Sequence, residues 1–191
     1  MKIALILFLL PIIIGCANIQ KSKNDIPQNY SEYKKNSKIP EIKNFLLTGK
    51  FSLFIKEKGL SGRIQWLSKD GNDTIEIFDP FNSTIAKIYL TKSPKNISFT
   101  TPSSSQSKET EKFIRNIFGT SNNIFMLRKF LLSPPIELSN NQNVSINFNG
   151  WVIRFKGIYD NIRKISKTVE YTKGNLSLKI FINNLKILKK K

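Results

Sequence analysis

Cys16 is the only cysteine of this 191-residue chain, and histidine is absent. Without histidine the chain lacks the commonest general base and metal ligand, which removes most hydrolase triads. Ser, Asp, Glu and Lys are present, but no pair stands at a spacing diagnostic of a catalytic site. A single thiol cannot form a disulfide within the chain, and a covalent modification of the thiol would explain why the chain keeps just one cysteine. An enzyme is therefore the least favoured class of function, and neither a metal nor a catalytic residue is expected.

The residues before Cys16 form a targeting segment. Lys2 is a minimal positive start, and residues 3–14 are apolar but too few to span a bilayer. The segment ends in IIGC at residues 13–16. This ending resembles a bacterial lipobox, in which the thiol is diacylated before signal peptidase II cuts in front of it. A Leu and then Ala or Ser are more usual where Ile13 and Ile14 stand, so an ordinary secretory peptide with a chance cysteine remains the alternative.

Three regions follow from this interpretation. We predict a lipoprotein signal peptide over residues 1–15, a lipidated Cys16 with a flexible tether over residues 16–42, and one folded domain over residues 43–191. The tether is polar and rich in Lys, Asn and Ser, with room for a short helix around residues 30–35. Diacylglycerol and an N-acyl chain on Cys16 would anchor the protein firmly, at about 0.8 kcal/mol per buried CH₂. No other cofactor is expected.

The formal charge of +18 invites a nucleic-acid interpretation. We do not favour it, because the Lys residues are scattered among many Asn and Ile and no RNA- or DNA-binding motif is visible. A cationic surface is also attracted to anionic membranes, which fits a lipid anchor better.

Apolar side chains recur at every second position from Phe45 onward, which indicates antiparallel strands joined by short turns. Gly59 and Asp70-Gly71 are expected as turns, and four or more strands occupy the first half. The same pattern resumes between Val144 and Ile182, with turns at residues 149–150 and 173–175.

The stretch from Thr74 to Leu90 predicts a hairpin with a polar turn that contains an aromatic residue. Asp79, Pro80, Asn82 and Ser83 are turn formers, and Phe81 lies among them where the local pattern does not bury it. Two interpretations are open. Phe81 either folds back onto the core or forms an apolar tip that touches a membrane or an apolar ligand.

Two helices are expected between the two sets of strands. Gly119 is a natural end for the first helix, and Ser121 or Asn122 could cap a second that ends at residues 133–135. Their apolar faces comprise Phe113, Ile114, Ile117 and Phe118, then Ile124, Leu127, Phe130 and Leu131.

A sheet with one apolar face must curl or be covered. We therefore expect a mainly β protein: a curled antiparallel sheet, an unclosed half-barrel with helices against its concave face. Periodicity does not decide whether the interior is a filled core or a pocket.

Four segments, in this order and spacing, resemble the LolB family of outer-membrane lipoproteins, which receive other lipoproteins from the periplasmic carrier LolA. They are GKF at residues 49–51, GRIQW at 62–66, DPFNST at 79–84 and GWVIRF at 150–155 followed by Tyr159. The match covers roughly residues 45–188. Two positions depart from the family pattern, because Phe130 and Leu185 stand where it has Trp.

The resemblance implies an unclosed antiparallel β-barrel with an α-helical lid over a hydrophobic cavity, in a protein that acts as a monomer. It also implies a protruding membrane-insertion loop at Pro80, Phe81 and Asn82, where the family usually has Leu after the Pro. Burying such a side chain in lipid contributes about 1.5–3 kcal/mol.

The implied function is acceptance of lipoproteins from a LolA-type carrier and their insertion into the inner leaflet of the outer membrane. Acyl chains would pass from pocket to pocket without covalent chemistry, so the expected partners are the carrier, the cargo and outer-membrane phospholipid. The expected wall of the cavity is Phe51, Leu53, Ile64, Trp66, Ile75, Ile77, Ile88, Trp151, Ile153, Phe155, Leu178 and Ile180. The expected lid is Ile114, Ile117, Leu127, Phe130 and Leu131.

Two other functions remain open at the level of sequence. A lipid-anchored structural or assembly protein would have a packed core and no lipid cavity. A soluble carrier of the LolA type would need an N-terminus without lipid on Cys16.

Overall fold

The computed structural model describes residues 26–29, 42–91, 96–101, 105–133, 143–160 and 165–189. The expected signal peptide, Cys16 and the short helix expected around residues 30–35 lie outside these ranges. The elements of the first half are β1 (Ile26–Asn29), β2 (Phe45–Ile55), β3 (Lys58–Lys69), β4 (Asn72–Phe78), β5 (Thr84–Leu90) and β6 (Ile97–Thr100). They are followed by α2 (Ser105–Phe118), α3 (Ser121–Leu132), β7 (Val144–Phe148), β8 (Trp151–Asp160), β9 (Ile165–Lys173) and β10 (Leu176–Ile187).

The strands of the described chain form one sheet in the order β1-β7-β8-β9-β10-β2-β3-β4-β5-β6. Strands β2 to β10 pair antiparallel, and the last strand of the chain, β10, joins the two halves by pairing with β2. The edge strands β1 and β6 are not neighbours, so the sheet is unclosed, which confirms the expected architecture. Strand β1 pairs parallel to β7 within the stretch expected as a tether, and the sequence does not indicate it.

The tight turns follow local sequence in most places. Asp70 and Gly71 have φ of 53° and 85°, and Asn149 and Gly150 have φ of 49° and 78°, as expected for two-residue hairpin turns with left-handed backbone. The expected turn at Gly59 is wrong, because the β2–β3 turn lies two residues earlier at residues 56–57. Gly59 pairs with Phe54, and a Cβ there would lie 2.8 Å from the Phe54 ring. Its lack of a side chain makes room for an aromatic ring.

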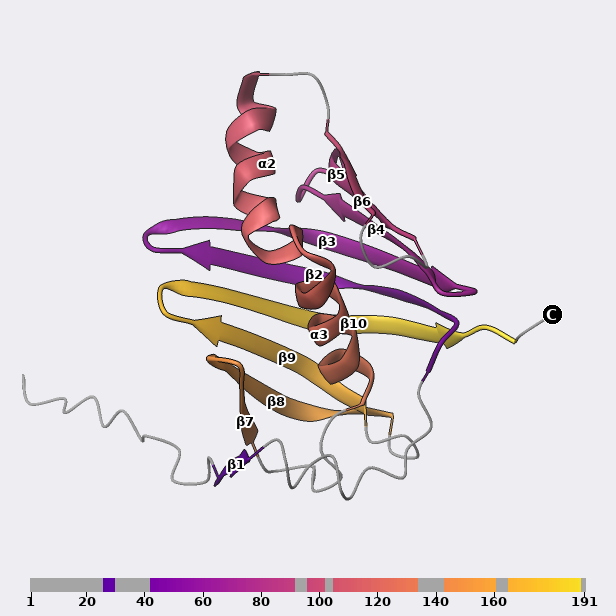
Figure 1. The fold of residues 1–191 in the computed structure, drawn as a ribbon, viewed down its shortest axis with the longest axis vertical. Coiled ribbons are helices and arrows are strands. Elements are labelled where there is room, and N and C mark those ends of the chain that lie inside the picture. Colours follow the sequence, from indigo (N-terminus) through magenta and orange to yellow (C-terminus); the bar gives the residue numbers. More distant parts are fainter. Residues whose placement is uncertain are drawn as a thin grey trace, which may run out of the picture.

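The two helices of the described chain lie on one face of the sheet (Figure 1). The amide of Gly119 donates to the carbonyl of Arg115 at 2.8 Å, which closes the end of α2 as expected. The expected cap of α3, Ser121 or Asn122, is one or two residues too late: Thr120 is the N-cap, and its hydroxyl accepts from the amide of Asn123 at 3.1 Å.

The core lies between this face of the sheet and the helices (Figure 1). Inward-facing residues of β2, β3, β4 and β5 and of β7 to β10 contribute to one continuous apolar cluster with α2 and α3. The sequence alternation therefore corresponds to an inner apolar face and an outer polar face, as in β2, where buried Phe51 and Leu53 flank Ser52.

Candidate functional site

The residues expected as cavity wall and lid are together in one interior. Every one of them is at most 7% exposed, and all belong to the same apolar cluster. Trp66 and Phe45 pack with ring centroids 5.9 Å apart, and Phe130 of α3 packs against Phe155 of β8 at 6.4 Å. In this conformation hydrocarbon side chains from both layers line the interior and contact one another.

An ion pair holds α3 over one part of this interior. Arg128 Nη1 lies 3.2 Å from Asp73 Oδ2 on β4, and Nη2 donates to the carbonyls of Ile42 and Lys43 at 3.2 and 2.9 Å. Trp66 Nε1 donates to the other carboxylate oxygen of Asp73 at 3.0 Å. The buried carboxylate therefore has partners from the helix and from the sheet, as a buried charge requires.

Tyr171 of β9 makes a second polar contact with α3. Its hydroxyl donates to the carbonyl of Leu127 at 2.8 Å, and the side chain is fully buried. Burial raises the pKa of Tyr171 well above its usual value, because the phenolate would lose its hydration. The phenol therefore stays neutral at physiological pH, and its hydroxyl proton remains available for the hydrogen bond to the Leu127 carbonyl.

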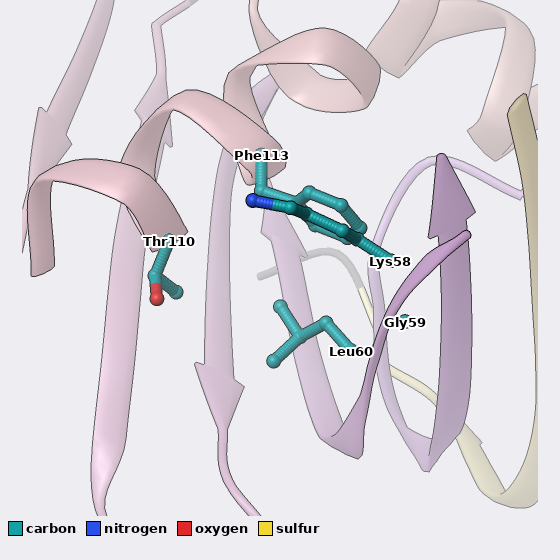
Figure 2. A pocket seen from close by; sticks show the side chains of 5 residues that line it. All are labelled: Lys58, Gly59, Leu60, Thr110 and Phe113. Carbon is teal, nitrogen blue, oxygen red and sulfur yellow. The ribbon is translucent and has the colours of Figure 1, made fainter. Parts of the chain in front are cut away.

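A hollow of about 330 Å³ opens between α2 and the start of β3. Figure 2 shows Phe113 of α2 and Leu60 of β3 turned into this space, with Thr110, Gly59 and Lys58 around it. Leu60 and Phe113 are half-buried and pack against the apolar cluster, so the hollow reaches the edge of the interior. The sequence did not single out Leu60, Thr110 or Lys58, because only the placement of α2 brings them together.

The β4–β5 loop presents Phe81 to solvent, with 89% of the residue exposed. The amide of Asn82 donates to the carbonyl of Asp79 at 3.1 Å, and the amide of Ser83 donates to Asp79 Oδ1 at 2.8 Å. Pro80 and Phe81 are thus the central residues of a tight turn, and Asn82 leaves it with φ of 74°. The interpretation that Phe81 folds back onto the core is wrong.

A family model described as outer membrane lipoprotein LolB matches residues 43–184. The chain belongs to the LolB family. An outer-membrane lipoprotein LolB from Nitrosomonas europaea is 16% identical over 189 residues, covering 93% of this chain and 89% of that protein.

LolB family proteins are outer-membrane lipoproteins that serve the localisation of other lipoproteins, and they are not enzymes. Membership of the family places this chain at the outer membrane. Within the described ranges, His, Cys, Asp and Glu do not gather into a group that could hold a metal ion. Neither described helix has the length and apolar character needed to cross a membrane.

Proposed function

We propose that this LolB protein accepts lipoproteins from a LolA-type periplasmic carrier and inserts them into the inner leaflet of the outer membrane. The acyl chains of the cargo would move from the carrier's pocket into the apolar interior, and from there into the bilayer. No bond is made or broken in this transfer.

The apolar interior between the unclosed sheet and the two helices is the observation that carries the proposal. A protein-bound acyl chain exposed to water costs about 0.8 kcal/mol per CH₂, so a carrier must keep it covered at every stage. The interior offers hydrocarbon surface from both layers, and the hollow at Leu60 and Phe113 leads to it from outside. The volume of this hollow, about 330 Å³, lies within the range typical of ligand pockets, which is about 300–1,000 Å³.

Uptake requires the lid to move, because the wall and lid side chains contact one another in this conformation. The hollow lies beside α2, whereas α3 is held to the sheet by Arg128 and Tyr171. We therefore propose that α2, which packs against β5 and α3, moves to widen the hollow beside β3 and admit acyl chains, while α3 stays in place.

The exposed Phe81 would act in delivery rather than in uptake. Its turn is held by hydrogen bonds to Asp79 and projects from the sheet, so the side chain can enter a bilayer without unfolding the domain. A lipid anchor on Cys16 would keep the domain next to the membrane, facing the periplasm.

A structural or assembly lipoprotein with a packed core is the second candidate function. The observation in its favour is that every expected wall and lid residue is buried against its neighbours, as in an ordinary core.

Uptake of a fluorescent fatty-acid probe distinguishes the two functions. The proposed function predicts saturable binding with a blue-shifted emission, and Leu60→Glu should weaken it because a charge would face the entrance. Leu67→Glu, at an exposed position on the outer face of the same strand, is the matched control. An interior that takes up no probe at any probe concentration would favour the structural or assembly lipoprotein with a packed core.

A further inference from the structure

A second hollow, of about 360 Å³, lies on the opposite side of the sheet from the lid. It is lined by side chains of the outer face, including Lys50 of β2, Arg63 and Gln65 of β3, and Phe78 of β4. Asn82, the neighbour of Phe81 in the exposed loop, forms part of the same lining. The hollow is therefore continuous with the loop.

The two basic residues of this hollow stand directly opposite each other. Lys50 pairs with Arg63 across the antiparallel β2–β3 ladder, and both are exposed. Like charges in this position repel and destabilise a sheet. Within the described part of the chain neither Lys50 nor Arg63 has an acidic partner. The Arg63 guanidinium carbon lies 5.9 Å from the centroid of the Phe78 ring. An anion between them would remove the repulsion.

The neutral lining residues suit a phosphate group. Gln65, Asn82 and Asn183 line the hollow and carry side-chain amides that can donate, and no acidic side chain is among its described lining residues. Phosphate oxygens prefer charged donors from Arg and Lys together with neutral N–H donors.

We propose that this hollow binds the phosphate of a phospholipid headgroup while the Phe81 tip is inserted in the bilayer. The inference rests on the proposed function. Phe81 fixes the source of the phosphate, because a side chain that enters the hydrocarbon region places its neighbour Asn82 at the depth of the headgroups. Lys50 and Arg63 then contact the headgroup, hold the loop in the membrane and set the orientation of the domain on it.

Photolabelling tests the site directly. The full-length protein is inserted in phosphatidylcholine nanodiscs with a small fraction of phosphatidylglycerol that carries a photoreactive headgroup, and labelled residues are located by mass spectrometry. We expect labels between residues 48 and 65 and between residues 78 and 82. Lys50→Gln with Arg63→Gln should reduce this labelling about tenfold, because the phosphate loses both of its charged hydrogen-bond donors.

The matched control is Lys69→Gln with Lys186→Gln, which removes the same charge from exposed positions nearer the other end of these strands. It should change the labelling less than about twofold, since the attraction is local. Lys50→Arg with Arg63→Lys keeps both charges and should retain the labelling. Equal losses in the two Gln pairs would show a general charge effect and overturn the site. Removal of the label by soluble glycerol phosphate would assign the hollow to free phosphate esters and overturn the lipid assignment.

Cargo uptake from a loaded carrier, measured on the same samples, separates this inference from the proposed function. We expect uptake to be unchanged in the Lys50→Gln, Arg63→Gln protein. Labelling of the hollow in a protein that takes up no cargo would overturn the proposed function and support the headgroup site. Uptake with labels only elsewhere would overturn the headgroup site alone.

Discussion

Arg128 on helix α3 forms an ion pair with Asp73 on β4, with 3.2 Å between Nη1 and Oδ2. The side chains are 14% and 4% exposed, and 55 residues of chain separate them. This contact fixes α3 to the sheet, and the proposed uptake of acyl chains depends on how firmly α2 and α3 are each held.

Replacing Arg128 with Ala should lower the free energy of unfolding by about 3 kcal/mol, because it leaves the buried Asp73 charge without its partner. Urea unfolding measures the change. The matched control is Arg115→Ala on α2, whose ion pair with Glu111 lies on the surface. Its cost should be much smaller than that of Arg128→Ala, because exposed ion pairs contribute little and what remains is the contact of Arg115 with the Phe99 ring. Equal losses in the two variants would contradict the role of the Asp73 pair.

Tyr171→Phe should cost about 1 kcal/mol at neutral pH, because the hydrogen bond to the Leu127 carbonyl is lost. The difference in unfolding free energy between the wild type and Tyr171→Phe should change with pH. Burial raises the pKa of Tyr171 in the folded state, so the unfolded chain releases the phenol proton first, near pH 10. The stability that comes from Tyr171 is complete below about pH 10 and is lost as the pH rises further. Unfolding at pH 8 and pH 11 should therefore show a smaller difference between the two proteins at pH 11. A constant difference would show that the phenol ionises equally in both states.

Phe81→Glu should leave folding and cargo uptake intact but impair delivery to membranes, because a charged tip does not enter hydrocarbon. Transfer of a fluorescent lipoprotein to acceptor vesicles measures delivery. Phe81→Leu should deliver as well as the wild type, since the tip remains apolar. Phe125→Glu makes the same change at another exposed phenylalanine, on α3. Normal delivery by Phe81→Glu would remove the insertion role of the loop.

Thr110→Trp should slow cargo uptake without loss of stability, because the indole would occupy the hollow beside Leu60 and Phe113. Uptake rate from a loaded carrier and thermal unfolding are the two measurements. Lys112→Trp places the same side chain at an exposed position of α2 away from this hollow. If both variants take up cargo at the wild-type rate, acyl chains enter elsewhere.

Local sequence was sufficient for much of the fold. The turns at Asp70-Gly71 and Asn149-Gly150 follow from residues that tolerate left-handed backbone, and the inward faces of the strands follow from alternation. The turn expected at Gly59 is wrong, because this glycine lies inside strand β3. Its role depends on the ring of Phe54, which only the register of β2 and β3 brings opposite.

Some features of the candidate site also follow from local sequence, and others depend on contacts between distant segments. Phe81 was singled out by its position between turn formers, but its exposure depends on the hydrogen bonds that Asp79 makes across the loop. The contacts of Asp73 with Arg128, and of Leu60 with the hollow under α2, join segments far apart in the chain. No local pattern indicates them, because each side chain also fits an ordinary strand or helix position.

Transfer of cargo from the carrier tests the central claim most directly. The chain that starts after Cys16 is mixed with a LolA-type carrier loaded with a lipoprotein, and a pull-down of each protein shows where the lipoprotein resides. We predict that the lipoprotein moves onto this protein, because its apolar interior covers the acyl chains. A lipoprotein that stays on the carrier, with both proteins folded, would contradict the proposed acceptance of cargo.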